Sequence, residues 1–350
     1  MTILVMALLM GPAPINSKAV AANVSAGLVI EGLRPIAFAP APTGSKFAVC
    51  LEDGSVRVMD AKTHQTIKTL AKHPQPAYAI AWSPDGTYVA TGDESARIFI
   101  ESPITGEKIR EYRTHTKGIQ KLSFNLTRQY LISTGKDDQI NIYDISKPSP
   151  REVRKILGKG ANFYGATFSP KLPYTITTGI LGPGGRTYDS NSGQVTGFLA
   201  TVDQQGVYDV CYNPAGTREV TAGKDGEALV WDSTSLKKVG TLKGHQDWVM
   251  YAAYSPNGKL IATASTDKTV RIWNASTYQE ITELSAQNNV GSPVCFTADG
   301  NCLLTVNDQG FLEFNPVTPS QAFVDEPSKV VGAKKAKPAK RRTKKHHVAS

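Results

Sequence analysis

The stretch that decides the fold is GHQDWVMYAAYSPNGKLIATASTDKTVRIWN, residues 244–274. Alternating apolar residues indicate three β-strands within it. Residues that favour tight turns interrupt the alternation at Pro256-Asn257-Gly258 and at Asp267-Lys268. A sheet of this size cannot bury both of its own faces, so the question that follows is whether the unit recurs.

The unit occurs seven times in the chain. Its last strand ends in a β-branched residue, an aromatic residue and an Asp or Asn, as in Ile272-Trp273-Asn274, and related endings return at intervals of 40 to 45 residues. Such a period, made of strands only, is typical of propeller blades with four strands each. The last residues of the seven endings are Asp60, Ile100, Asp144, Asp189, Asp232, Asn274 and Asn315.

A second set of positions follows the same period. An aromatic residue precedes the position of Trp273 in every repeat, and an apolar residue lies two positions before it. A spacing of two is that of one buried face of a strand, here the innermost strand of each unit. The aromatic residues are Phe38, Trp82, Phe124, Phe168, Tyr212, Tyr254 and Phe296, and the apolar residues are Ile36, Ile80, Leu122, Ala166, Val210, Ala252 and Val294.

A third set is an Asp six residues before the strand-ending aromatic position in six of the seven repeats, found as Asp53, Asp93, Asp137, Asp225, Asp267 and Asp308. With these three sets, residues 34–315 resemble the WD40-repeat β-propeller family. The resemblance implies an all-β fold, a seven-bladed β-propeller of four-stranded antiparallel blades that is closed by an N-terminal strand.

Residues 23–325 are predicted to form this single closed domain. An open ring would leave unpaired sheet edges, which invite aggregation, so the last repeat needs one strand from elsewhere in the chain. The apolar stretch 24–33 stands where that strand is expected, and residues 321–324 are the alternative.

Residues 1–22 are predicted to lie outside the propeller, as an apolar arm or a leader peptide. Their apolar run, residues 2–10, is too short to span a membrane as a helix, which takes about 20 residues. No Lys or Arg precedes the run, although Ala19-Val20-Ala21 resembles a cleavage site. We therefore expect a cytoplasmic protein, with secretion as the alternative.

Residues 326–350 form a basic tail whose composition predicts disorder. Eight of the nine net positive charges of the chain lie within residues 334–350, which contain no acidic residue. The tail is a solvated segment without a partner, a salt-sensitive tether to nucleic acid or another polyanion, or a nuclear-import signal in a eukaryotic host. Its basic residues are Lys334, Lys335, Lys337, Lys340, Arg341, Arg342, Lys344 and Lys345.

Neither a metal site nor a cofactor site is expected. The four cysteines (Cys50, Cys211, Cys295 and Cys302) show no CxxC pattern and no Cys/His cluster, and we interpret them as small buried residues. Cys295 and Cys302 flank a turn and are candidates for cross-strand neighbours. The glycine-rich segment 179–185 lacks the features of a phosphate-binding loop and is interpreted as a surface loop.

The sixth repeat contains the residue types of a catalytic triad in His245, Ser265 and Asp267. The WD40 resemblance implies instead a structural tetrad completed by Trp273, in which Asp267 accepts a hydrogen bond from His245 and Trp273 donates its indole N–H. No enzymatic activity is expected. Related sets in the second and third repeats are His73 with Asp93 and His115 with Asp137, with Phe99 and Tyr143 in place of the tryptophan.

The candidate binding residues lie four positions before each inner-strand aromatic residue. Simple alternation would bury them, but they are too polar for a core, which predicts a β-bulge or emergence onto the rim of the propeller channel. We expect a non-catalytic scaffold that binds a protein or peptide there, as a monomer within a complex. The alternative is a nucleic-acid- or ribosome-associated protein that binds mainly through the tail. The rim residues are Arg34, Tyr78, Gln120, Tyr164, Tyr208 and Met250, with Trp248 beside them.

Overall fold

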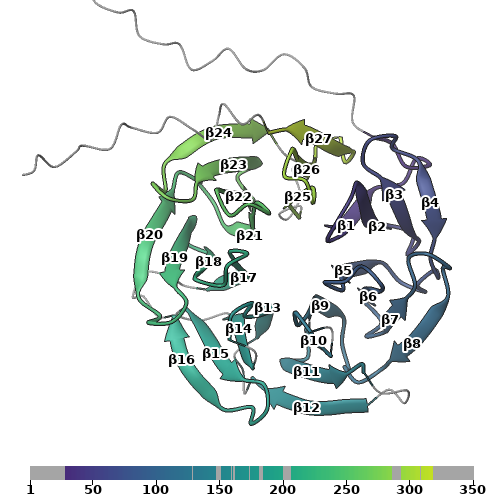
Figure 1. Cartoon of the computed structure of the whole chain (residues 1–350), viewed down its shortest axis with the longest axis horizontal. Coiled ribbons are helices and arrows are strands. Elements are labelled where there is room, and N and C mark those ends of the chain that lie inside the picture. Colours follow the sequence, from purple (N-terminus) through teal and green to yellow (C-terminus); the bar gives the residue numbers. More distant parts are fainter. Residues whose placement is uncertain are drawn as a thin grey trace, which may run out of the picture.

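A computed structural model describes residues 28–127, 129–146, 151–158, 160, 162–172, 174–180, 184–199, 206–285, 293–307 and 309–317. Within these ranges the regular elements are β-strands, which form seven antiparallel sheets. The sheets stand around a central axis as the blades of a ring (Figure 1). The protein is therefore a seven-bladed β-propeller, as the repeats predict. None of the residues described belongs to a helix of the length and apolarity that a membrane crossing requires.

Six blades have four strands, which follow the chain from the axis outward (Figure 1). Blade 1 contains β1 (Pro35–Pro40), β2 (Lys46–Leu51), β3 (Val56–Asp60) and β4 (Thr66–Thr69), and blade 2 contains β5 (Ala77–Trp82), β6 (Val89–Asp93), β7 (Ile98–Glu101) and β8 (Lys108–Tyr112). Blade 3 contains β9 (Ile119–Phe124), β10 (Tyr130–Gly135), β11 (Gln139–Asp144) and β12 (Arg151–Leu157), and blade 4 contains β13 (Phe163–Phe168), β14 (Thr175–Ile180), β15 (Gly185–Asp189) and β16 (Val195–Leu199). Blade 5 contains β17 (Val207–Tyr212), β18 (Arg218–Gly223), β19 (Glu227–Asp232) and β20 (Lys238–Lys243), and blade 6 contains β21 (Val249–Tyr254), β22 (Leu260–Ser265), β23 (Thr269–Asn274) and β24 (Glu280–Ser285).

Blade 7 has three strands of its own, β25 (Cys295–Phe296), β26 (Cys302–Val306) and β27 (Leu312–Pro316). The N-terminal segment completes it, since the N–H of Leu28 donates to the carbonyl oxygen of Leu312 at 2.7 Å in an antiparallel bridge. Ile30 is buried in the apolar cluster shared by blades 1 and 7. The predicted closure by the N-terminal segment is confirmed, and the alternative strand at 321–324 lies outside the residues described.

The hydrogen-bond register corrects the first repeat. In blade 6 the N–H of Ser255 closes the turn after the inner strand, and in blade 1 the corresponding N–H is that of Ala41. Pro40 therefore occupies the place predicted for Phe38, which lies two positions earlier in the strand. Phe38 is still buried, in the cluster between blades 7 and 1.

The second repeat is displaced in the same way. The N–H of Ser102 closes the turn that Asn274 closes in blade 6, so the repeat ends at Ser102 and not at Ile100. Glu101 consequently takes the place of Trp273, as the matching bulges after Ile100 and Ile272 also indicate. A shift of two residues leaves every side chain on the same face of its strand, so hydrophobic alternation cannot detect it.

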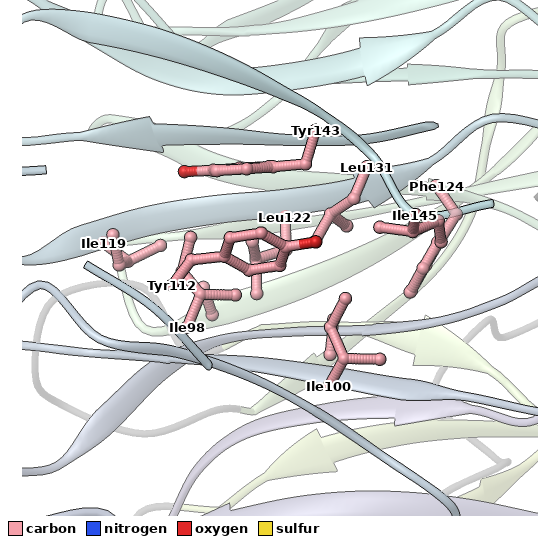
Figure 2. Close-up of a cluster of buried hydrophobic side chains, with 11 residues drawn as sticks. Ile98, Ile100, Tyr112, Ile119, Leu122, Phe124, Leu131, Tyr143 and Ile145 are labelled. Carbon is pink, nitrogen blue, oxygen red and sulfur yellow. The ribbon is translucent and has the colours of Figure 1, made fainter. Parts of the chain in front are cut away.

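Each interface between neighbouring blades has its own apolar cluster. Figure 2 shows the cluster between blades 2 and 3, where Ile98 and Ile100 of one blade face Leu122 and Leu131 of the next. Six interfaces bury between 8 and 11 residues in this way. Among the residues described, the cluster between blades 4 and 5 has only three members, Leu199, Leu229 and Trp231, although Val207 and Val210 of β17 are also buried.

Candidate functional site

A β-bulge opens the inner strands near their first residues, as predicted. The pairing of β5 with β6 skips Tyr78, that of β17 with β18 skips Tyr208, and that of β21 with β22 skips Met250. The ladder of blade 3 skips Gln120, and in blade 4 an irregularity spans Tyr164. A bulged residue is released from the alternation of its strand, which explains why polar and aromatic side chains are tolerated at these positions.

Blade 1 departs from this pattern because of its shifted register. Its bulged residue is Ile36, not Arg34. Arg34 lies before β1, where its carbonyl accepts from the N–H of Glu52 as the carbonyl of Trp248 accepts from Thr266 in blade 6. Arg34 therefore corresponds to Trp248, and both side chains are exposed at the same end of the ring.

Three of the predicted rim residues form a continuous aromatic arc (Tyr164, Tyr208 and Trp248) contributed by blades 4, 5 and 6. The rings of Tyr164 and Tyr208 meet edge to face with centroids 5.1 Å apart, and those of Tyr208 and Trp248 stack at 5.6 Å. Trp248 is 41% exposed, whereas Tyr208 is buried between its neighbours. The ammonium group of Lys224 lies 5.1 Å from the centroid of Trp248.

Tyr78 lies on a separate part of the rim and is 49% exposed. The ammonium group of Lys136 is 6.0 Å from its ring centroid and forms an ion pair with Glu94 at 2.8 Å. Gln120 and Met250 are half-buried. The structure thus brings three of the seven predicted residues together and leaves Tyr78 as a second exposed aromatic side chain.

An ion pair that the sequence analysis missed lies inside the ring of inner strands. Lys121 of β9 reaches past β13 to Asp209 of β17, with an Nζ–Oδ1 distance of 2.8 Å. Gly165 leaves the space for this crossing, because a Cβ there would lie 3.0 Å from Asp209 Oδ1. Burial lowers the pKa of Lys121, but the charge of Asp209 outweighs it and the net pKa is raised, so the lysine stays protonated.

A signal for this pair is present in the sequence. Lys121, Gly165 and Asp209 each stand three residues before the inner-strand aromatic position, in consecutive repeats. Opposite charges at equivalent positions, separated by a glycine, indicate two side chains that can meet across the intervening strand.

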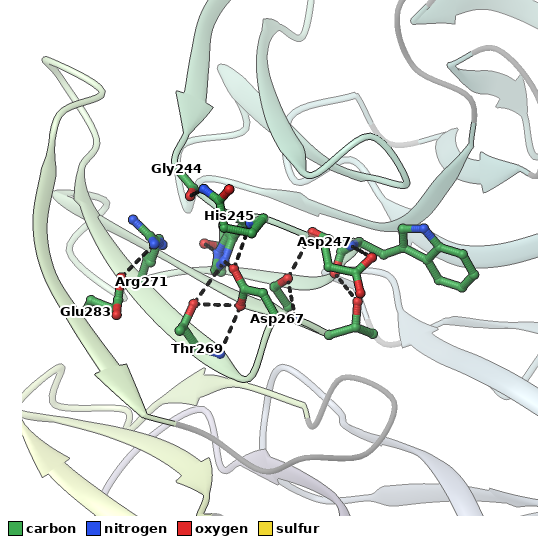
Figure 3. A network of polar contacts seen from close by, with 12 residues as sticks. Gly244, His245, Asp247, Asp267, Thr269, Arg271 and Glu283 are labelled. Atoms are coloured by element: carbon green, nitrogen blue, oxygen red, sulfur yellow. Dashed lines mark hydrogen bonds and ion pairs between the residues drawn. The ribbon is translucent and has the colours of Figure 1, made fainter.

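The predicted tetrad of blade 6 forms, with one substitution of partner. His245 Nδ1 lies 2.9 Å from Asp267 Oδ2, and His245 Nε2 lies 2.7 Å from the hydroxyl of Thr263, which accepts from Trp273 Nε1 at 2.8 Å. These partners assign the imidazole tautomer: Thr263 donates to Nε2, and Nδ1–H donates to Asp267. Figure 3 shows His245 and Asp267 within the wider polar network.

Ser265 is not the hydroxyl partner of His245, which corrects the predicted tetrad. Its hydroxyl donates to the carbonyl of Asp247 at 2.9 Å and accepts from the N–H of Asp267 at 3.0 Å. The reason is strand geometry: Thr263 pairs opposite Arg271, deeper in the sheet, whereas Ser265 stands at the end of β22. The hydroxyl that contacts His245 is that of Thr263, which is fully buried, so the network is shielded from solvent as a structural network is.

Blade 3 contains an equivalent network. His115 Nδ1 lies 2.9 Å from Asp137, and His115 Nε2 lies 2.7 Å from the hydroxyl of Ser133. The phenol of Tyr143 is 3.0 Å from Ser133, so it replaces the indole as predicted. In blade 7, Asn315 and not Phe314 stands at the tryptophan position, and its amide donates to Thr305 at 2.8 Å.

In blade 2 the predicted contact of His73 with Asp93 is present, at 3.0 Å, and Thr91 is the hydroxyl partner at 2.7 Å. The predicted role of Phe99 is wrong, since its ring stacks on His73 with centroids 4.0 Å apart and Glu101 takes the tryptophan position. Burial lowers the pKa of both His73 and His245 despite their Asp partners, so both are neutral at pH 7.

Glu101 is a second residue that the sequence analysis missed. It is fully buried, one carboxylate oxygen accepts from the N–H of Ala71 at 2.6 Å, and the other has no partner among the residues described. Burial raises its pKa to about 7. The sequence analysis missed this acid because it assigned Phe99, two residues earlier, to the tryptophan position.

The four cysteines are free thiols. Cys295 pairs with Leu304 and not with Cys302, and burial raises the pKa of all four. The described part of the chain holds no cluster of three His, Cys, Asp or Glu residues suited to a metal ion. The basic tail, residues 1–22 and residues 181–183 of the glycine-rich segment lie outside the residues described. The segment is only in part the predicted surface loop, because Gly179 and Ile180 end β14 and Gly185 begins β15.

Comparison with known proteins agrees with the fold. The family described as WD domain, G-beta repeat matches residues 64–100, 106–144, 195–232 and 236–274. Among curated proteins, the chain is 29% identical over 189 residues to Cleavage stimulation factor subunit 50 of Arabidopsis thaliana, covering 50% of this chain and 44% of that protein. It is 27% identical over 217 residues to WD repeat-containing protein srw1 of Schizosaccharomyces pombe, covering 60% of this chain and 38% of that protein.

A third relative is Nuclear distribution protein nudF of Aspergillus niger, 26% identical over 185 residues, which cover 52% of this chain and 41% of that protein. The chain thus spans less than half the length of these relatives. The four matched repeats, the seven antiparallel blades and the His–Asp networks agree, and the chain belongs to the WD40-repeat β-propeller family.

Proposed function

We propose that this propeller is a non-catalytic scaffold that binds a protein or peptide on the rim through the aromatic arc. The observation that carries the proposal is the exposure of Trp248, a large aromatic side chain, in a row with Tyr208 and Tyr164. Tryptophan and tyrosine dominate protein-binding hot spots because they bury a large apolar area at little conformational cost. Tyr208, wedged between its neighbours, holds the row rigid.

The charges near the arc add a preference for partner chemistry. Lys224 lies beside Trp248 and Lys136 beside Tyr78, so each of these two exposed rim residues has a cation next to it. An acidic or carboxylate-bearing side chain next to an apolar anchor would complement this arrangement. We include in the proposal that the partner presents such a segment.

The test is Trp248→Ala, with Tyr174→Ala as the matched control. Tyr174 is 49% exposed, similar to the 41% of Trp248, but it lies in the turn after β13, at the opposite end of the ring from Tyr164. A partner captured by affinity purification of the wild type should bind Trp248→Ala at least tenfold more weakly, the loss expected for a hot spot of about 2 kcal/mol. Equal affinity of both variants would sink the proposal.

A second candidate function rests on the basic tail. Eight Lys and Arg residues without an acid between 334 and 350 favour sequence-blind binding of nucleic acid or another polyanion. Deleting 334–350 should remove the salt dependence of binding to a single-stranded RNA probe between about 50 and 200 mM salt. Unchanged binding and salt slope after deletion would exclude the tail as the contact.

A further inference from the structure

The interface between blades 4 and 5 is unlike the other six. Among the residues described, its apolar cluster is the smallest of the seven. Blade 4 faces it with Thr177 and Thr187, which pair across β14 and β15. The hydroxyl of Thr177 lies 2.5 Å from that of Tyr212 on blade 5.

Threonine is an exception at the position of Thr177. Cross-strand pairing defines the residues that correspond to Thr177 in the other blades, and all of them are apolar. They are Ala48, Ala90, Ile132, Val220, Ala262 and Leu304.

The opposing face of blade 5 contains a further exception, Glu219. It stands on β18 between Tyr212 and Trp231, and it is fully buried. In the other six blades this position is apolar, so the carboxyl group replaces an aliphatic or aromatic side chain. The corresponding residues are Phe47, Val89, Leu131, Ile176, Ile261 and Leu303.

The carboxylate of Glu219 has no cationic partner among the residues described, and its polar neighbours are the hydroxyls of Thr177 and Tyr212. Burial raises its pKa to about 7, the charge of Asp232 adds to the rise, and the hydroxyls of Thr177 and Tyr212 lower it. Arg218, the nearest cation in sequence, is paired with Asp232 at 2.6 Å. The remaining titratable groups that interact electrostatically with Glu219 are Cys211 and Tyr254, both neutral because burial raises their pKa.

We propose that the interface between blades 4 and 5 is a pH-sensitive seam at which the ring opens, and that protonation of Glu219 keeps it closed. A neutral carboxyl can remain among the hydroxyls of Thr177 and Tyr212. An ionised one has no cation to pair with, and it draws water into an interface whose apolar cluster is the smallest among the residues described.

The seam passes directly beneath the aromatic arc. Tyr164 belongs to blade 4 and Tyr208 to blade 5, so their edge-to-face contact crosses it. Opening would separate these two rings and alter the rim, which makes the rim responsive to pH near neutrality. Lys121 and Asp209 join blade 3 to blade 5 next to the axis and limit the opening there.

The direction of the pH dependence follows from the linkage between protonation of Glu219 and opening of the seam. Because the pKa of this carboxyl is raised in the closed state, it does not destabilise that state below its ordinary pKa. As the pH rises toward 7, it destabilises the closed state increasingly. The open fraction should therefore increase about tenfold between pH 6 and pH 8 and level off above.

The test measures access of a thiol reagent to the seam. Thr187→Cys introduces a near-isosteric thiol there, and the native Cys50, buried between blades 1 and 2, is the reference in the same molecule. Labelling rates of both thiols are measured by mass spectrometry from pH 6 to pH 8 and divided by the rates of the unfolded peptides. The rate of the introduced thiol should rise about tenfold while that of Cys50 stays constant.

Glu219→Gln in the Thr187→Cys background should abolish this pH dependence, and Glu101→Gln should leave it intact. If Glu219→Gln does not fold, Glu219→Ile, which restores the residue of blades 4 and 6, serves in its place. An equal rise at Cys50, or a rise that survives the loss of the Glu219 carboxyl, would overturn the proposal.

Discussion

At the scale of single residues, the His–Asp networks satisfy several buried polar groups through one shared hydroxyl. Thr263 shows this most clearly, because its one hydroxyl serves both His245 and Trp273. Ser265, two residues further on, bonds only to backbone groups. The two hydroxyls therefore differ in how many buried groups depend on them.

Thr263→Val should destabilise the protein more than Ser265→Ala. The valine leaves His245 Nε2 and the indole N–H of Trp273 without a partner, each at about 1–3 kcal/mol, whereas the alanine costs about 1 kcal/mol. The measurement is the free energy of unfolding in urea for both variants. The reverse order would show that Ser265 is the central hydroxyl after all.

The negative charge of Glu101, and not the size of its side chain, destabilises the folded protein. Its pKa of about 7 lies above the ordinary value of 4.5, so the protein loses stability as the pH rises from 4.5 to 7. Glu101→Gln keeps an oxygen for the N–H of Ala71 and removes the charge.

We expect Glu101→Gln to stabilise the protein by up to about 3 kcal/mol at pH 8 and to have little effect near pH 4.5. Urea unfolding of both proteins at the two pH values measures the difference. An equal effect at both pH values would mean that burial does not perturb this carboxyl.

At the scale of the element, the bulge near the start of the inner strands gives one residue of a buried strand to the rim. Tyr78, Tyr208 or Met250 is the bulged residue, and the residue before it is fully buried. The same inner strands contribute Lys121 and Asp209, which link blades that are not neighbours.

Lys121→Met should destabilise the protein by about 2–3 kcal/mol, because it leaves Asp209 buried without its cation. This is below the usual cost of breaking a buried pair, since the Lys121 side chain is 32% exposed and solvent reaches it. In the double variant with Asp209→Leu most of the loss should be recovered. Urea unfolding of the two single variants and the double variant provides the thermodynamic cycle, and additive losses would argue against a direct interaction.

At the scale of the whole molecule, closure of the ring depends on a short N-terminal segment. Ile30 belongs to the cluster that blades 1 and 7 share, and it is 3% exposed, whereas its neighbour Val29 is 49% exposed. The segment is held to blade 7 by the bridge between Leu28 and Leu312.

Ile30→Ala should therefore cost about 2–4 kcal/mol and lower the melting temperature, while Val29→Ala should change it little. Light scattering during heating provides a second measurement, because an open ring exposes the edge of β27 and should aggregate at a lower temperature. Equal melting temperatures for the two variants would show that closure does not depend on this segment.

The sequence predicted the number of blades, the strand period and most members of the His–Asp networks. It misplaced Phe38 and Phe99 by two residues because both errors preserve the face of the strand. It assigned Ser265 and not Thr263 as the hydroxyl partner of His245, because that assignment came from the resemblance to the WD40 family and not from the pairing of strands. It missed Glu219 for a related reason. This acid stands out only when the equivalent positions of all seven blades are aligned, because the other six are apolar.

What the sequence by itself determined is the architecture, because a repeat of 40 to 45 residues with a buried face in every strand can be satisfied only by stacking equivalent sheets. Only the tertiary structure decided which side chains of different blades come into contact. The aromatic arc, the pair of Lys121 with Asp209 and the polar seam between blades 4 and 5 each join residues at least 35 positions apart. Such contacts depend on the curvature and register of a closed ring, which no periodicity along one strand encodes.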